Sequence, residues 1–182
     1  MKPSPFNYYR VDSVGNALAL LKEHGDDAQI LAGGQSLMAM MNLRLLAPEA
    51  LIDINSIEEL SGISQVDGAI RIGALTRHSE VENSDIVAQH LPLLTMAIGH
   101  VGHAAIRNRG TLGGSISLAD PAAEMPACAI ALNAEIELQG PGGTRRIAAH
   151  DFFHGLFETE RQADELLTAV YFPLPSPENQ SA

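Results

Sequence analysis

Two short segments about eighty residues apart contain residue types that bind anions through the backbone. They are Ile30-Leu31-Ala32-Gly33-Gly34-Gln35-Ser36-Leu37 and Arg107-Asn108-Arg109-Gly110-Thr111-Leu112-Gly113-Gly114-Ser115. Adjacent glycines let the backbone turn through positive φ and, without a Cβ, let an anion approach the main-chain N–H groups. The side chains of Gln35, Ser36, Thr111 and Ser115 add neutral donors. Together the segments predict a phosphate site that needs few lysines, which suits a chain of net charge -11.

Either segment alone also fits a simple turn, because a lone pair of glycines most often marks one. No Gly-Lys-Ser/Thr follows either pair, so neither is a P-loop. The G-x-G-x-x-G spacing of dinucleotide-binding Rossmann folds is absent as well. The residues by themselves therefore leave turn and anion site open.

Predicted strands and a helix position the first segment. Residues 29–31 read as a short buried strand that leads into the glycines, and Ser36 as the cap of a helix from Leu37 to about Leu45. A phosphate at that helix start would gain from free N–H groups and the helix dipole. Residues 51–54 form a second buried strand, parallel to the first if the helix is a crossover.

The second half of the chain is predicted to alternate hairpins and helices. Asp67-Gly68 between apolar runs is a strong two-residue hairpin signal. Thr76 is predicted to open a helix, and one further helix to run from Ile86 to Gly99. Residues 134–139 and 168–172 read as strands.

A helix start is predicted at Asp120, with Asp120 as N-cap and Pro121 in the first helical position. Glu124 would then lie in the first turn, where the dipole favours a carboxylate whatever its role. Arg107 and Arg109 lie at the start of the second glycine segment. A functional role, in contact with the phosphates or with a partner subunit, would explain them as well as a structural role in salt bridges.

Five ordered motifs resemble one known family. They are Ala32–Leu46, Leu51–Ile54, Arg71–His78, Ile106–Ser115 and Ala119–Pro126. The family is the FAD-binding medium subunit of molybdenum hydroxylases, of the carbon monoxide dehydrogenase and xanthine dehydrogenase type. The likeness runs from about Phe6 to Pro173 and implies an α+β fold, a two-lobed FAD-binding domain. We expect lobes at 1–55 and 56–175 and a flexible tail at 176–182.

The resemblance implies FAD as cofactor and a set of residues that bind it. The backbone of both segments would hold the diphosphate, Glu124 the ribose of the adenosine, and the backbone near Leu167 the adenine. The implied cofactor-binding residues are Ala32, Gly33, Gly34, Gln35, Ser36, Leu37, Thr111, Gly113, Gly114, Ser115, Glu124 and Leu167. No residue reads as a general base or nucleophile.

The resemblance also implies a molybdenum-cofactor large subunit and a [2Fe–2S] small subunit as partners. Electrons would pass from the iron–sulfur clusters to FAD and then to an external acceptor, making the chain an oxidoreductase subunit. Family members continue for about another hundred residues into a domain that covers the flavin. A scaffold without FAD and a stand-alone flavoprotein therefore remain as alternatives.

Composition excludes several other classes. The acidic charge argues against a nucleic-acid partner, since phosphates demand basic patches. No apolar run approaches the roughly 20 residues of a membrane span, and no signal peptide is recognised, so the cytoplasm is expected. A single cysteine, Cys128, excludes a cysteine-ligated cluster within this sequence. The histidine spacings do not predict a metal site.

Overall fold

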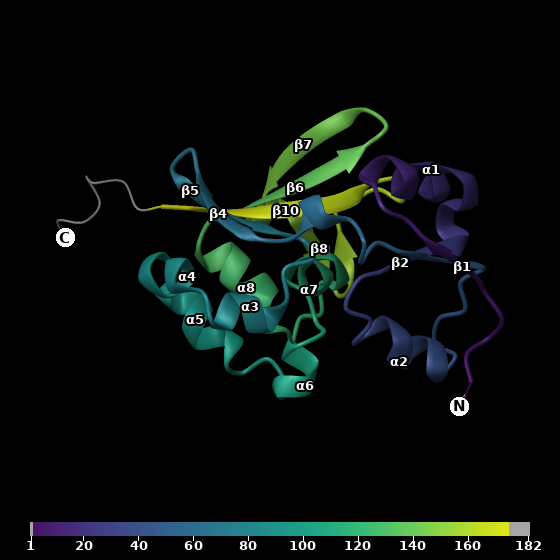
Figure 1. The fold of residues 1–182 in the computed structure, drawn as a ribbon, viewed down its shortest axis with the longest axis horizontal. Helices are drawn as coiled ribbons and strands as arrows, with labels where there is room; N and C mark the ends of the chain where they lie inside the picture. The colour runs from purple at the N-terminus through teal and green to yellow at the C-terminus, as the bar shows by residue number, and fades with distance from the viewer. Residues whose placement is uncertain (1, 175–182) are drawn as a thin grey trace.

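A computed structural model describes residues 2–174 and contains a small parallel sheet near the N-terminus (Figure 1). Its strands run in the order β1-β3-β2, and β3 pairs in parallel with both neighbours. The parallel pairing of the two predicted strands is thereby confirmed. The elements of this region are β1 (Asn7–Arg10), α1 (Val14–His24), η1 (Gly25–Asp27), β2 (Ala28–Leu31), α2 (Leu37–Asn42) and β3 (Ala50–Asp53).

Helix α1 follows the capping rules of its sequence. The Ser13 hydroxyl accepts a hydrogen bond from the backbone N–H of Asn16 at 3.3 Å, and Gly25 ends the helix at a φ of 54°. Val14, Ala17 and Leu21 are buried and pack into a core shared with β2 and β3. This face fixes α1 on one side of the parallel sheet.

A five-stranded antiparallel sheet forms the centre of the remaining chain. Its order is β4-β5-β10-β6-β7, so the last strand lies between two earlier hairpins. Asp67 and Gly68, with φ of 49° and 77°, form the predicted turn between β4 and β5. The strands are β4 (Ile63–Val66), β5 (Ala69–Gly73), β6 (Glu135–Gly140), β7 (Gly143–Ala148) and β10 (Leu166–Pro173).

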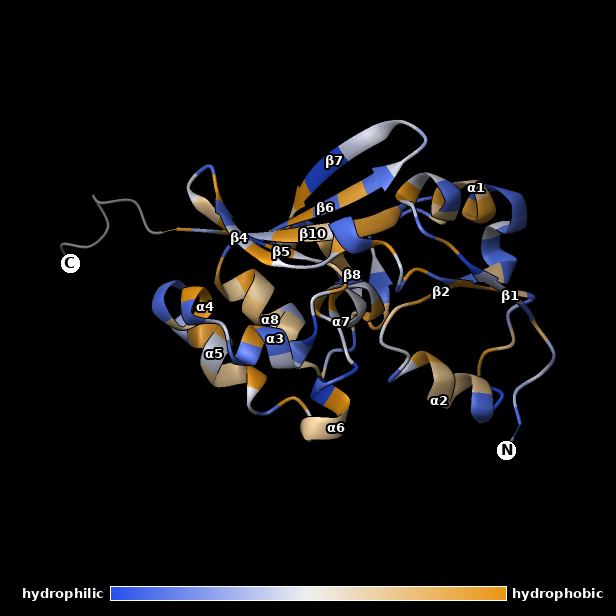
Figure 2. Ribbon diagram, in the orientation of Figure 1, coloured by the Kyte–Doolittle hydropathy of each residue, from blue (hydrophilic) through white to orange (hydrophobic). Residues whose placement is uncertain are grey.

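Short helices cover one face of the antiparallel sheet (Figure 1). Apolar side chains of β10 and β6 pack against those of α5, α7 and α8 in one continuous core. Much of strand β10 is orange, the colour of hydrophobic residues, in Figure 2. The elements are η2 (Glu58–Leu60), α3 (His78–Glu82), α4 (Asp85–His90), α5 (Pro92–Ile98), α6 (Ala104–Arg107), α7 (Leu112–Leu118), α8 (Glu124–Ala131), α9 (Ala149–Phe152), β8 (Phe153–Gly155) and β9 (Glu158–Thr159).

The predicted single helix over residues 86–99 is wrong, because the structure has two helices. Leu91 lies between them with φ -130° and ψ 58°, and Pro92 starts the second. The ring of a proline disfavours helical backbone in the residue before it, which accounts for the break.

The predicted helix start at Thr76 is also wrong. Helix α3 begins at His78, and the Arg77 backbone N–H donates to the Glu80 carboxylate at 2.6 Å. Thr76 is buried, and its hydroxyl bonds both backbone groups of Gly62, at 3.0 and 3.1 Å.

Asp120 does not cap helix α8, contrary to the prediction. Its carboxylate accepts from the backbone N–H of Ala122 at 2.9 Å, and the helix begins only at Glu124, after Ala123. A side chain that bonds its own backbone two residues on forms a local turn, which competes with helix initiation. The first helix of the glycine region is shorter than predicted too, since α2 ends at Asn42.

The combination of a parallel sheet, an antiparallel sheet and segregated helices is an α+β fold, as predicted. Along the sequence, the strands of the parallel sheet precede residue 55 and those of the antiparallel sheet follow it. The division into lobes at 55 and 56 stays a prediction. The tail predicted at 176–182 lies outside the described residues. No helix within 2–174 has both the length and the apolar character to cross a membrane.

Candidate functional site

A cavity of about 400 Å³ lies between the parallel sheet and helices α7 and α8. Ligand pockets of proteins commonly enclose about 300–1,000 Å³. All the predicted cofactor-binding residues line this cavity: Ala32, Gly33, Gly34, Gln35, Ser36, Leu37, Thr111, Gly113, Gly114, Ser115, Glu124 and Leu167. The structure therefore brings together segments that are about eighty residues apart in the chain.

The first glycine segment, residues 32–37, is an open loop between β2 and α2. Gly34 has a φ of 71°, which a residue with a Cβ disfavours. The backbone N–H groups of residues 33–37 donate to no other group within the described chain. Ser36 does not cap α2 with its side chain, so its hydroxyl is also available. The loop presents a row of unused donors at the cavity.

The second glycine segment, residues 110–115, is the start of helix α7. Gly113 and Gly114 are helical and lack positive φ, so the left-handed backbone that adjacent glycines allow is not adopted here. The N–H of Leu112 donates to the Thr76 carbonyl and that of Gly113 to the Ala74 carbonyl, both at 3.0 Å. These amides hold the segment to the end of β5 and cannot serve a ligand at the same time.

The hydroxyl groups of Thr111 and Ser115 and the backbone N–H groups of Thr111 and Gly114 remain as donors in the second segment, since the Thr111 N–H donates to no other group within residues 2–174. The Thr111 hydroxyl caps α7 by accepting from the Gly114 N–H at 3.1 Å, and Gly114 itself is exposed. That bond involves a rotatable hydroxyl, so a ligand oxygen can replace it as acceptor. The Ser115 side chain is half-buried at the cavity wall.

The two glycine segments touch directly. A Cβ on Gly33 would lie 2.8 Å from the Gly110 Cα and still closer to the Arg109 carbonyl oxygen. A glycine is needed at position 33 because the second segment occupies the space of a side chain. This close approach limits how near the two sets of donors can come to each other.

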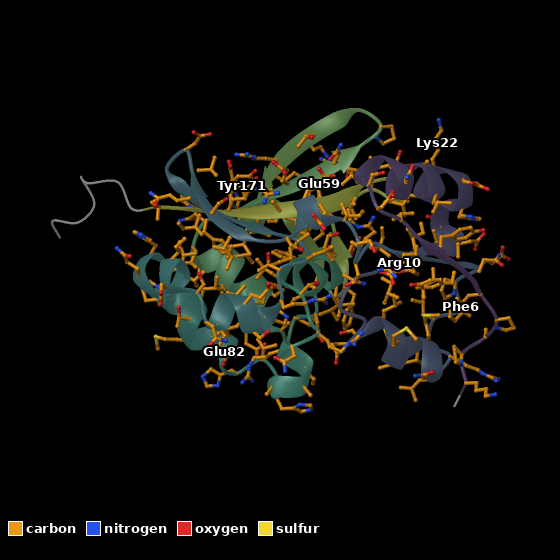
Figure 3. The ribbon with its side chains drawn as sticks, in the orientation of Figure 1. Phe6, Arg10, Lys22, Glu59, Glu82 and Tyr171 are labelled. Carbon is orange, nitrogen blue, oxygen red and sulfur yellow. The ribbon has the colours of Figure 1, made fainter. Side chains whose placement is uncertain are left out.

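Arg107 forms a structural ion pair. Its Nε donates to the Glu82 carboxylate at 2.8 Å, and both side chains are partly withdrawn from solvent. Glu82 lies among the helices that cover the antiparallel sheet (Figure 3). Of the two open explanations, a salt bridge describes Arg107, whereas the side chain of Arg109 is exposed.

Glu124 and Leu167 contribute two different surfaces to the cavity. Glu124 is the first residue of α8, half-buried, and its carboxylate forms no hydrogen bond or ion pair among residues 2–174. Leu167 is buried in β10, next to an irregularity in its pairing with β6. Glu124 thus offers an unused acceptor to the cavity, and Leu167 offers an apolar wall.

His78 lines the cavity and was missed by the sequence prediction. It is only 4% exposed, and its Nδ1 is buried without a hydrogen-bond partner within the described residues. Burial, assisted by the charge of Arg107, lowers the pKa of His78 to about 4, so the ring is neutral at pH 7. The motif Arg71–His78 is part of the family resemblance, but nothing in its sequence reveals that the His78 ring is buried.

Arg161 is a second cavity residue that sequence did not single out. Its guanidinium donates to the carbonyls of Gln162 and Glu165 at 2.8 and 2.9 Å. Burial lowers the pKa of Arg161, partly offset by the Glu165 carboxylate. The cation is thus tied to the loop before β10 and adds positive charge to one end of the cavity.

Residues 4–175 match the family model described as the FAD binding domain in molybdopterin dehydrogenase. The match spans nearly all of the chain, so the protein belongs to this family, and the prediction of family and cofactor is confirmed. FAD is the cofactor that this domain binds.

Named relatives are subunits of dehydrogenases. The sequence is 43% identical over 95% of its length to the 6-hydroxypseudooxynicotine dehydrogenase complex subunit alpha of Paenarthrobacter nicotinovorans, covering 58% of that protein. It is 30% identical over 94% of its length to the xanthine dehydrogenase FAD-binding subunit of Escherichia coli O157:H7, covering 58% of it. The chain thus belongs to a family of oxidoreductase subunits and spans about 60% of the length of such relatives.

A solved structure supports the same assignment. The carbon monoxide dehydrogenase from Hydrogenophaga pseudoflava superposes with a TM-score of 0.95 at 42% identity, covering 97% of this chain and 62% of the other. The predicted fold class is thereby confirmed.

The cavity fits a flavin dinucleotide. The open loop supplies uncharged donors to a diphosphate, which a glycine-bordered nest of N–H groups binds well. The Glu124 carboxylate, which has no partner among residues 2–174, can accept from a sugar hydroxyl. Apolar walls at Leu37 and Leu167 suit a ring system.

Proposed function

We propose that this chain carries the FAD of a molybdenum hydroxylase and transfers electrons through it. The observation that carries the proposal is the loop of residues 33–37. Its N–H groups donate to no group within the described residues, and the loop lines the same cavity as the other predicted binding residues. Bound FAD supplies the redox chemistry, because the flavin accepts and releases electrons one or two at a time.

The residues of the protein bind the FAD and orient it. The N–H groups of the first loop and the hydroxyls of Thr111 and Ser115 hold the diphosphate. Glu124 accepts hydrogen bonds from the adenosine ribose, and the backbone near Leu167 meets the adenine. The lobes 1–55 and 56–175 provide the two sides of this site.

The partners are a molybdenum-cofactor large subunit and a [2Fe–2S] small subunit. Electrons pass from the iron–sulfur clusters to this FAD and on to an external acceptor. Support comes from relatives named as a medium chain of carbon monoxide dehydrogenase and as a FAD-binding subunit of xanthine dehydrogenase. The cytoplasm is the proposed location, in keeping with one buried, unpaired cysteine.

Affinity purification of the tagged chain from its native host tests the assembly. We expect molybdenum, iron and FAD to co-purify in fixed ratio with two further polypeptides. Recovery of FAD without either metal would contradict the electron-transfer role while leaving the cofactor in place. A complex with the metals and no FAD would identify a scaffold instead.

A further inference from the structure

A short chain of hydrogen bonds joins the two glycine segments from outside the cavity. The Asn55 amide nitrogen donates to the Ala32 carbonyl at 2.9 Å. The Asn55 side-chain oxygen accepts from the Arg77 guanidinium at 2.6 Å, and the other guanidinium arm of Arg77 donates to the Arg109 carbonyl. Among residues 2–174 this is the one side-chain hydrogen-bond path between the segments.

Both bridging residues come from elements that are already fixed. Asn55 follows strand β3, where its N–H and side chain also bond Asp53 at 2.9 and 2.7 Å. Arg77 precedes helix α3, and its own N–H bonds Glu80. Each end of the bridge is therefore anchored to a different part of the fold. The bridge thus couples the position of one glycine segment to that of the other.

Neither Asn55 nor Arg77 lines the cavity. Their hydrogen bonds to the glycine segments go to the backbone carbonyls of Ala32 and Arg109. An effect of Asn55 or Arg77 on ligand binding must therefore act through the backbone of Ala32 and Arg109.

The guanidinium of Arg77 is well suited to set a spacing. It is planar, with two arms at a fixed angle, so two acceptors on separate arms are held at a fixed separation. Burial, with the charge of Arg109, lowers the pKa of Arg77, as expected of a cation partly withdrawn from water. Such a group is held to carbonyl and amide oxygens by charge-assisted hydrogen bonds.

Direct contact of the loops cannot set the spacing alone. Contact of Gly33 with Gly110 stops the segments from moving closer, but it does not stop them from separating. The Asn55–Arg77 bridge resists separation, and together the two features define one distance.

We propose that Asn55 and Arg77 are positioning residues that hold the two glycine segments at the spacing a diphosphate requires. This inference rests on the proposed binding of FAD in the cavity. It assigns part of the dinucleotide affinity to residues that do not touch the dinucleotide, because preorganised donors bind more tightly than donors that must be brought together.

Four variants separate geometry from charge. Arg77→Met removes both arms, and Arg77→Lys keeps the charge but cannot reach both acceptors with a planar fork. Asn55→Ala removes the link to the first segment. Asn55→Asp keeps an acceptor for Arg77 and replaces the donor to Ala32 with a repelling oxygen.

Arg71→Met is the matched control. Arg71 lies on β5 and carries the same charge, and among residues 2–174 its side chain bonds only the Glu59 carbonyl, at 3.4 Å. It does not line the cavity, and within the described residues its side chain forms no hydrogen bond with either glycine segment. Any effect of net charge alone should appear equally in this variant.

The measurement is the Kd of FAD for the purified full chain, by quenching of flavin fluorescence, at a temperature where circular dichroism shows each variant folded. We expect all four variants to weaken FAD binding by about tenfold, the lower range for outer-shell hydrogen bonds that orient a site. The double variant Asn55→Ala/Arg77→Met should bind no more weakly than Arg77→Met. Arg71→Met should keep the Kd of the parent.

Three results would overturn the inference. Unchanged FAD affinity in Asn55→Ala would show that the bridge is dispensable. Parent-like affinity in Arg77→Lys would show that charge and not spacing matters. Additive losses in the double variant would show two independent effects. A parent chain that binds no FAD would instead refute the proposed function, and the inference with it.

Discussion

The two glycine segments share a sequence pattern but differ in structure. The first is an open loop with a left-handed glycine and unused N–H groups, whereas the second is a helix start whose amides are largely engaged. In the second segment Gly113 serves packing, because its missing side chain lets α7 approach Ala74. Glycine pairs that look alike in sequence can therefore serve ligand approach in one place and backbone packing in another.

The largest effect is expected at Gly113. A Cβ there would lie 2.6 Å from the Ala74 Cβ and 2.7 Å from its carbonyl oxygen, and backbone cannot move aside cheaply. We expect Gly113→Ala to lower the free energy of unfolding by about 1–3 kcal/mol, as for overpacked cores. Urea denaturation of the ligand-free protein measures this.

Gly142→Ala is the control for Gly113→Ala, because no atom lies within 4 Å of its added Cβ and its φ is not positive. It should unfold at the parent's urea concentration. If Gly113→Ala also matches the parent, the packing role assigned to the second segment is wrong.

A pH effect is expected from His78, which packs against Gly110 of the second segment. Its pKa is lowered from 6.5 to about 4, so between these values the unfolded chain takes up a proton that the folded chain resists. Stability should therefore fall as pH drops from 6.5 to 4, by about 1.4 kcal/mol per pH unit, with no contribution above pH 6.5. In His78→Asn this part of the slope should vanish.

Urea titrations of both proteins at several pH values measure that difference. His150→Asn is the control, since His150 is two-thirds exposed. If the parent and His78→Asn lose stability in parallel between pH 6.5 and 4.5, the ring is not held neutral by burial.

Local sequence signals predicted much of the framework. The Asp67-Gly68 turn and the parallel pairing of β2 with β3 follow from short-range rules. The motif order predicted the family, the fold class and FAD. Errors came where two local preferences compete, as at Asp120, whose side chain bonds its own backbone and not the helix.

Contacts between distant elements could not be predicted in this way. The bridge from Asn55 to Arg77 joins residues 22 positions apart, and the burial of His78 depends on how α3 meets the second segment. The engaged amides of Leu112 and Gly113 depend on the end of β5. Each is a result of tertiary packing, for which no periodicity or spacing in the sequence is a signal.

The most direct test of the account compares Gly34→Ala with Gly68→Ala. Both glycines have left-handed φ, 71° and 77°, so both variants carry a similar backbone penalty of about 1–2 kcal/mol. Only Gly34 borders the unused N–H groups at the cavity; Gly68 lies in the β4–β5 hairpin turn.

FAD is titrated into the parent and both variants, and flavin fluorescence is followed. The account predicts saturable binding to the parent, the parent's affinity in Gly68→Ala, and an affinity at least tenfold weaker in Gly34→Ala. Equal affinity in Gly34→Ala and Gly68→Ala would contradict the central claim that the first loop holds the dinucleotide.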